Sequence, residues 1–287
     1  MATNKAASAK KSKTASTKKQ TTTRVTTVKS TSTKPKNTVK GSTRELVDSK
    51  SKSPLTAALV AEFIGTFILA VIVISTSGNA IPVGFALIAI VLMIGALSGA
   101  HVNPLVTAGA WVTRRIGGKR ALGYIAAQAL GAMLALVVMS SYAGLMGEPN
   151  EQAAMMGIQQ GLFKVNPISG ESKAVWHVFF AEMVGASIFG FAVASAIQER
   201  RNRAAQALAV GFGLFTALTV AGGAAALAQA HIILNPAVAL SVQAVQWPLK
   251  DIFPVLVYVI SPILGGAIGF FLYDLMRGQQ ESKSDEE

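Results

Sequence analysis

The sequence predicts an all-α membrane protein in which six transmembrane helices and two re-entrant half-helices form an inverted repeat. Three observations predict this fold. Hydrophobic residues make up 51% of the 287 residues and the mean hydropathy is +0.47, which is too apolar for a soluble protein of this length. Six apolar runs are long enough to cross a bilayer, and two others reach only half of that length. Short patterns in the first half recur in the second.

Residues 1–53 differ in composition from the rest of the chain. They contain 14 Lys and Arg against only Glu45 and Asp48, whereas the remainder carries 12 basic and 12 acidic side chains, so the net charge of +12 belongs to this segment. It has no aromatic residue and cannot bury enough apolar surface to offset its ordering entropy. We predict a disordered basic N-terminal tail that attracts anionic lipid headgroups. Nucleic-acid binding is disfavoured, because no aromatic residues stand between the lysines to stack on bases.

The six long runs contain 18–26 residues each, which matches the ~20 residues that a membrane-spanning helix needs. They are Leu55–Ser75, Ala80–Leu97, Ala121–Met146, Val175–Ile197, Ala204–Ala228 and Ile252–Leu275. The predicted channel domain covers residues 54–276, with repeat one at 54–146, a connecting loop at 147–173 and repeat two at 174–276. A short polar C-terminal tail follows at 277–287.

Basic residues indicate how the spans are oriented. The tail, the cluster at 114–120, the cluster at 200–203 and Arg277 stand at alternate connections, which six crossings bring to the same side. Because cytoplasmic loops carry an excess of Lys and Arg, both termini are predicted to be cytoplasmic. We expect a multi-pass protein of the plasma (cell inner) membrane.

The two short runs, Pro104–Thr113 and Pro236–Val245, have about 10 residues each, and ~15 Å of helix covers half of a bilayer. They are predicted to be half-helices. Residues 61–66 resemble residues 181–186, and residues 83–85 resemble 210–212. With three crossings per repeat, the copies have opposite topology, so the half-helices enter from opposite faces.

Each half-helix opens with Asn-Pro, at Asn103-Pro104 and at Asn235-Pro236. Asn is a favoured N-cap residue and Pro a favoured first helical residue. Both helix starts therefore meet at mid-membrane, with free N–H groups, positive dipole ends and amide donors. This arrangement repels cations and pins the oxygen of a permeating molecule, so neutral solutes pass and protons do not.

These residues carry a family resemblance. Residues 98–107 (Ser-Gly-Ala-His-Val-Asn-Pro-Leu-Val-Thr) resemble the first signature of the aquaporin and aquaglyceroporin (major intrinsic protein) family, and Asn235-Pro236-Ala237 resembles the second. Residues 124–131 look like its third helix and residues 261–265 like its sixth. The resemblance covers roughly residues 55–275. It implies a homotetramer with one pore per subunit, passive flux and no cofactor.

The chain departs from the family at several pore positions. Leu105 replaces the usual Ala of the first motif, and Val238 stands where an Arg of the selectivity filter is common. The filter position on the second span falls at Val83, and the position on the fifth span falls at Leu218 or Gly223. These residues predict an apolar and wide filter, which favours uncharged solutes such as glycerol, urea or ammonia over strict water selectivity.

Two roles are considered for each of four polar residues. Glu62 and Glu182 lie inside apolar spans, where we favour carboxylates that accept N–H groups of the segments before the half-helices over a proton relay. His101 and His231 precede the two motifs and are placed near the vestibule. A structural hydrogen bond is favoured for His101, whereas His231 is either structural or a replacement for the missing filter donor.

The predicted function is a passive channel for water and small uncharged solutes, with no enzymatic activity. The alternative is a non-conducting membrane scaffold of the same fold, with Leu105 plugging the midplane and the basic tail binding lipid or a partner. The chain has no cysteine, and its spans offer no nucleophile with a base and no metal-ligating cluster, so neither a metal nor another cofactor is expected.

Overall fold

A computed structural model of the chain describes residues 54–143, 145, 152, 155, 161–165, 168–199 and 201–284, and the side chains of these residues up to 278. The predicted disordered tail lies outside the described residues. In the described part, six segments are long and apolar enough to cross a membrane, which matches the predicted number. They are formed by α1 (Leu55–Ser75), α2 (Ala80–Ser98), α4 (Gly118–Ala143), α6 (Val175–Ala196), α7 (Arg203–Ala226) and the run of α9 (Phe253–Val255), η1 (Leu256–Ile260) and α10 (Ser261–Ser284).

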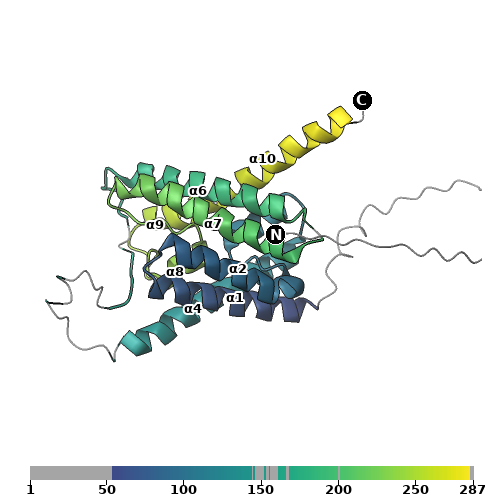
Figure 1. Cartoon of the computed structure of the whole chain (residues 1–287). Coiled ribbons are helices and arrows are strands. Elements are labelled where there is room, and N and C mark those ends of the chain that lie inside the picture. The colour runs from purple at the N-terminus through teal and green to yellow at the C-terminus, as the bar shows by residue number, and fades with distance from the viewer. Residues whose placement is uncertain are drawn as a thin grey trace, which may run out of the picture. The chain divides into compact units, whose positions relative to one another are not determined.

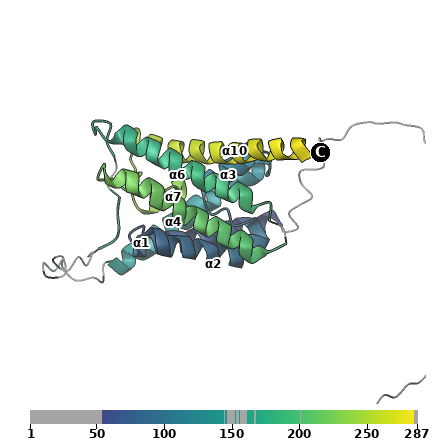
Figure 2. The same ribbon diagram turned by 45° about the horizontal axis from the view of Figure 1, so that its top comes forward.

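The helices form two groups that correspond to the two repeats. Helices α1, α2 and α4 lie together on one side of the bundle, and α6, α7 and α10 lie together on the other (Figures 1 and 2). A close helix contact within each group depends on an equivalent glycine. A Cβ atom at Gly131 of α4 would collide with the carbonyl of Phe63 in α1, and one at Gly265 of α10 would collide with the carbonyl of Met183 in α6. The repeat is therefore visible in the packing.

Two short helices, α3 (Pro104–Val112) and α8 (Pro236–Ser241), enter the bundle between these groups. Asparagine begins four of the helices. The side-chain oxygen of Asn79 accepts a hydrogen bond from the N–H of Ile81 at 3.0 Å, and that of Asn202 accepts from Ala205 at 3.0 Å. Asn103 and Asn235 cap α3 and α8 in the same way.

The second half-helix is shorter than predicted. The sequence suggests 10 residues up to Val245, whereas α8 has 6 and ends at Ser241. Gln243 adopts a left-handed backbone (φ 59°), and the chain turns back so that the N–H of Ala244 donates to the carbonyl of Ala239 at 3.0 Å. The prediction was wrong because apolar residues continue through this turn.

The sixth span is also not one regular helix. It begins with a short α-turn, passes through the wider turns of η1 and continues as α10. The wide turns end two residues before Pro262, which has no N–H to donate to the preceding turn. Helix α4 begins at Gly118, three residues before the predicted start, because Lys119 and Arg120 are good helix formers although they are too polar to count as part of an apolar span.

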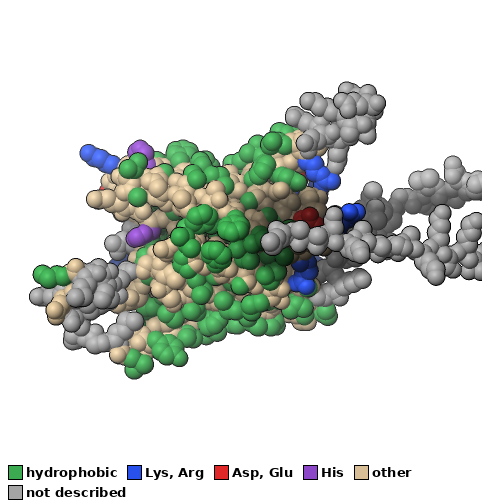
Figure 3. Space-filling model, viewed as in Figure 1, with side chains coloured by type: hydrophobic (Ala, Val, Ile, Leu, Met, Phe, Trp, Pro, Cys, Tyr) green, Lys and Arg blue, Asp and Glu red, His purple; other side chains and the backbone are tan. Residues whose placement is uncertain are grey.

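The outer surface of the bundle is apolar. Large hydrophobic side chains stand on it, among them Leu122, Val137 and Phe271, which are 62–73% exposed. Figure 3 shows hydrophobic side chains along the length of the bundle and most of the basic ones at one end. We call the end that carries Arg114, Arg115, Arg120, Arg201 and Arg203 the basic face. Such a surface suits contact with lipid.

Candidate functional site

The starts of α3 and α8 have the same local structure. Both asparagines have an extended backbone, with φ of −159° at Asn103 and −150° at Asn235. The Oδ1 atom of Asn103 accepts from the N–H of Leu105 at 3.0 Å. That of Asn235 accepts from Ala237 at 3.0 Å and from Val238 at 3.3 Å. The side-chain oxygen is thus used for capping, which turns the NH2 group outward from each helix start.

The two helix starts are bonded to each other. Nδ2 of Asn103 donates to the carbonyl of Leu234 at 2.8 Å, and Nδ2 of Asn235 donates to the carbonyl of Val102 at 3.0 Å. Each acceptor directly precedes the other asparagine. Because an amide nitrogen carries two hydrogens, each keeps one for a solute. The structure therefore brings together the two motifs, which are more than 130 residues apart in the sequence.

The backbone before each asparagine is strained. Val102 has a φ of 41° and Leu234 a φ of 52°, a region that side chains with a Cβ rarely adopt. These conformations expose the carbonyls of both residues to the opposite asparagine. Strain of this kind persists only where the surroundings hold it in place.

Two buried carboxylates hold these segments. Glu62 accepts from the N–H of His101 at 2.9 Å and of Val102 at 2.7 Å. Glu182 accepts from the N–H of Ile233 at 2.6 Å and of Leu234 at 3.0 Å. Both acids are fully buried, and their oxygens supply acceptors that the non-helical backbone would otherwise lack.

Repeat one adds a network of side chains around its carboxylate. Nε2 of Gln128 donates to Glu62 at 2.7 Å and to Oγ1 of Thr107 at 3.0 Å, and Nδ1 of His101 lies 3.2 Å from the same Thr107 oxygen. At Glu182 the described residues supply only the two backbone donors. Pro262 of α10 occupies the position that Gln128 has in α4, as the paired glycines three residues later show.

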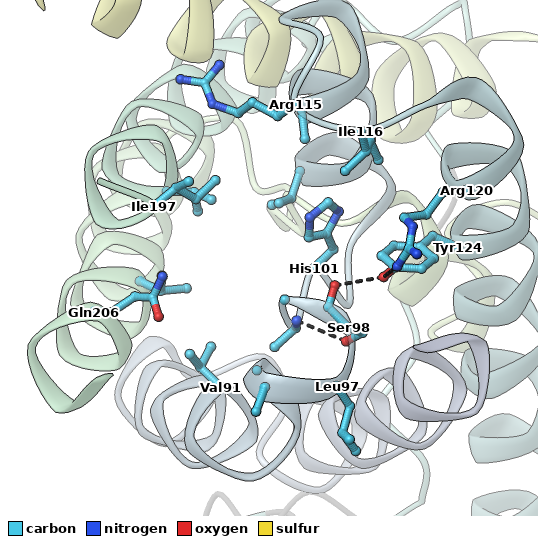
Figure 4. Close-up of a pocket in the computed structure, with 18 of the residues that line it drawn as sticks. Val91, Leu97, Ser98, His101, Arg115, Ile116, Arg120, Tyr124, Ile197 and Gln206 are labelled. Atoms are coloured by element: carbon cyan, nitrogen blue, oxygen red, sulfur yellow. Dashed lines mark hydrogen bonds between the residues drawn. The ribbon is translucent and has the colours of Figure 1, made fainter. Parts of the chain in front are cut away.

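A wide cavity of about 670 Å³ lies between the helix starts and the basic face (Figure 4). Its polar lining includes Ser98, His101, Arg115, Arg120, Tyr124 and Gln206. Both guanidinium groups are anchored: Arg115 forms two hydrogen bonds with Asp274 at 2.6 and 3.0 Å, and Arg120 donates to the hydroxyl of Tyr124 at 3.1 Å. Asp274 offsets the charge of Arg115, so Arg120 supplies the positive lining that opposes the entry of cations.

A narrow pocket lies on the other side of the asparagine pair. Its volume is about 20 Å³, which is room for about one water molecule. Val83, Leu218 and Val238 line it together with Asn103 and Asn235. Three predicted filter residues therefore meet, whereas Gly223 does not line the pocket and has no atom within 4 Å of where its Cβ would be.

The narrow pocket is apolar, as the sequence predicts, but it is not wide. Eight residues that the sequence prediction did not include also line it, and none of them has a polar side chain. Among them are Ile232, from the segment before α8, and Phe163, from the loop between the repeats. The sequence gives no distinct signal for Phe163, because the same loop holds another apolar stretch at residues 153–158.

The two histidines occupy different environments. His101 is buried (8% exposed) and lines the wide cavity, with its ring against that of Tyr124 at a centroid distance of 5.2 Å. His231 is exposed, lines neither of the two cavities, and packs its ring edge-on against Phe163 at 5.2 Å. His231 thus does not stand in the pocket as a substitute for a filter donor.

Leu105 does not plug the midplane. It is fully buried, lines neither cavity and points toward α10, where a Cβ atom at Gly266 would lie 2.9 Å from Cδ1 of Leu105. The glycine provides the room that the larger side chain needs. The scaffold alternative therefore loses the feature on which it rests.

The chain is similar to known proteins in sequence. Residues 47–273 match the model of the family described as Major intrinsic protein. The chain is 30% identical over 263 residues to Aquaporin AqpM of Methanothermobacter marburgensis, an alignment that covers 78% of this chain and 99% of the relative. It is 26% identical over 239 residues to Aquaporin Z of Photorhabdus laumondii, with 78% and 98% covered.

A solved structure shares the fold. The aquaglyceroporin from Plasmodium falciparum aligns with a TM-score of 0.58 at 22% identity, over 77% of this chain and 96% of that chain. No group of three His, Asp or Glu side chains in the described part of the molecule could hold a metal ion.

Proposed function

The chain belongs to the major intrinsic protein family, and from this premise we propose that it selects small uncharged solutes at the narrow pocket and excludes protons and cations at the asparagine pair. As a member of that family it is a passive, multi-pass membrane channel for water and small solutes and not an enzyme.

The observation that carries the proposal is the pair of hydrogen bonds between the two helix starts. They hold both amides beside the narrow pocket, each with one hydrogen left for a solute. A water molecule that accepts from both amides cannot also accept from its neighbour in the file, which interrupts proton transfer along the chain of waters. The positive lining of the wide cavity adds a barrier to cations.

The size of the narrow pocket predicts which solutes pass most readily. A space of about 20 Å³ with mostly apolar walls admits water and ammonia more readily than glycerol or urea, which are larger and lose more hydrogen bonds on entry. The pore residues in this proposal are Asn103 and Asn235 as donors, and Val83, Leu218, Ile232 and Val238 as the wall of the filter.

We further propose that the basic face and both termini are cytoplasmic, by the excess of arginine there. Residues 1–53 would then meet the anionic inner leaflet, where their Lys and Arg bind lipid headgroups. A homotetramer is proposed by analogy with the family alone. Mass spectrometry of the detergent-solubilised protein in its native state tests the subunit number.

The test of function is a solute panel on proteoliposomes in stopped flow, with water, ammonia, urea and glycerol, and with an enclosed pH dye to record proton leak. We expect faster movement of water and ammonia than in empty liposomes, a smaller gain for urea and glycerol, and no gain for protons. If none of the four solutes moves faster than in empty liposomes, the channel function is wrong and a scaffold of this fold is favoured.

A further inference from the structure

We propose that Phe163, from the loop between the two repeats, is a specificity-determining residue of this channel that sets the size limit of the narrow pocket. The inference rests on the proposed function and extends it to a residue outside the helices and half-helix segments that otherwise form the pathway.

The ring of Phe163 belongs to the pocket wall. It is 7% exposed and lines the pocket together with Val83, Leu218, Ile232 and Val238. All five side chains are apolar, so the segment outside the asparagine pair offers no side-chain hydrogen bond to a solute. The free space among them, about 20 Å³, contrasts with about 670 Å³ in the wide cavity. Phe163 has the largest side chain among all the residues that line the pocket, so shortening it should open more space than shortening any other.

One backbone hydrogen bond and two ring contacts hold Phe163 in this position. The N–H of Val165 donates to the carbonyl of Val242 at 2.8 Å, which ties the loop to the turn that follows α8. The ring of His231 packs edge-on against that of Phe163 with 5.2 Å between centroids. On the opposite repeat, Gly78 has no side chain, and a Cβ atom there would touch the phenyl ring at 3.6 Å. The loop residue is thus seated between both repeats.

The position of the Phe163 ring matters as much as its size. The same loop is held by a second hydrogen bond, seven residues after Phe163. The N–H of Gly170 donates to Asp251 at 2.9 Å, and a side chain at Gly170 would collide with the ring of Phe253. The backbone bonds at Val165 and Gly170 keep the loop beside the pocket, and the ring of His231 packs against the Phe163 ring within it. Selection by size then follows from the side chain at residue 163 itself.

The test compares Phe163→Ala with the wild-type channel in phosphatidylcholine and phosphatidylglycerol liposomes, with the ratio of glycerol to water permeability as the readout. This ratio is independent of how much protein is inserted. We expect it to rise roughly tenfold in Phe163→Ala, as for other pocket residues whose size sets selectivity, and by less in Phe163→Leu. His231→Ala, which removes the edge-on partner, should shift the ratio in the same direction by a smaller factor.

Phe271→Ala is the matched control, because Phe271 is 62% exposed on α10 and lines neither cavity. Its ratio should equal that of the wild type. Phe163→Leu keeps the test open if the alanine variant does not fold, as judged by gel filtration and melting temperature. An unchanged ratio in Phe163→Ala and Phe163→Leu while the wild type conducts, or an equal shift in Phe271→Ala, overturns the inference alone. No flux through any of the proteins overturns the proposed function as well.

Discussion

Leu105 packs into the space that Gly266 leaves on α10, so that a Cβ atom at Gly266 would lie 2.9 Å from both Cδ1 and the carbonyl oxygen of Leu105. In the other repeat the corresponding positions are Ala237 and Ala132, both buried. One pair therefore combines a leucine with a glycine, whereas the corresponding pair combines two alanines. The unusual residue of the first motif is accommodated by packing and does not close the pathway.

Leu105→Ala is therefore expected to destabilise the fold without raising water permeability. A cavity beside Gly266 should cost about 2–5 kcal/mol, as for other buried Leu to Ala changes. Gly266→Ala alone should cost about 1–3 kcal/mol through overpacking. The double variant should lose less than the sum of the two, which thermal unfolding in detergent measures. Increased water flux in Leu105→Ala would revive the scaffold alternative.

Replacing either pore asparagine by aspartate should lower water flux and raise proton leak. Asn235→Asp keeps the capping oxygen but loses the donor to Val102, leaving a buried carbonyl without its partner at a cost of about 1–3 kcal/mol. The added negative charge also attracts protons to the midplane. Asn79→Asp is the matched control, because Asn79 caps an exposed helix start and only its oxygen is used there. The proposal fails if Asn235→Asp and Asn79→Asp leak protons equally.

The two buried acids should differ in their response to amide substitution. The Glu62 carboxylate accepts from three N–H donors, and that of Glu182 accepts from two. In each glutamine variant, the new NH2 group opposes one of these donors. We expect a loss of about 1–3 kcal/mol at Glu62, and a smaller loss at Glu182, from melting temperatures of both variants. Glu199→Gln, at an exposed carboxylate on the basic face, should have no effect. A larger loss at Glu182 would contradict the assignment of donors.

The loop that carries Phe163 should loosen at low pH. Hydrogen bonds from the N–H groups of Phe253 and Gly170 hold the pKa of Asp251 below its ordinary value of 3.8. A lowered pKa in the folded protein means that this tie stabilises the loop above pH 3.8 and is lost as the pH falls through the lowered pKa. Hydrogen exchange at the Gly170 amide measures the tie.

In this experiment the Gly170 amide should be protected at neutral pH, exchange faster in Asp251→Ala, and remain protected in Glu199→Ala. The Glu199 carboxylate is the matched control because it also accepts two backbone N–H groups, those of Arg201 and Asn202, far along the chain. Equal exchange of Gly170 in the wild type and in Asp251→Ala would show that Asp251 does not hold the loop.

The number of spans and the starts of the half-helices could be read from the sequence, because bilayer thickness limits span length and Asn-Pro has a specific local geometry. The end of α8 could not. It depends on a left-handed residue, Gln243, and neither glycine nor proline marks that turn. The wide turns of η1 could not be predicted either. Pro262 removes one helical hydrogen bond, but the sequence does not specify which backbone geometry replaces it.

The site was predictable where local sequence determines it and not where distant segments meet. The sequence indicated Asn103 and Asn235, and the filter residues Val83 and Val238 followed from their spacing to the motifs. Choosing Leu218 over Gly223 required the packing of α7. The role of Phe163 depends on a loop that folds back over the other repeat, and the fit of Leu105 depends on a glycine 161 residues later. Such tertiary contacts leave no periodic signal.

The hydrogen bonds from Asn103 to Leu234 and from Asn235 to Val102 also limit how the two repeats can move. Carriers built from inverted repeats work by rocking one repeat against the other, so that a central site opens to each side in turn. Here that movement would break both bonds at once, at a depth where the lipid offers no substitute partners. We therefore expect the centre to stay fixed, and the flux to rise in proportion to the gradient without the saturation that a rocking carrier shows.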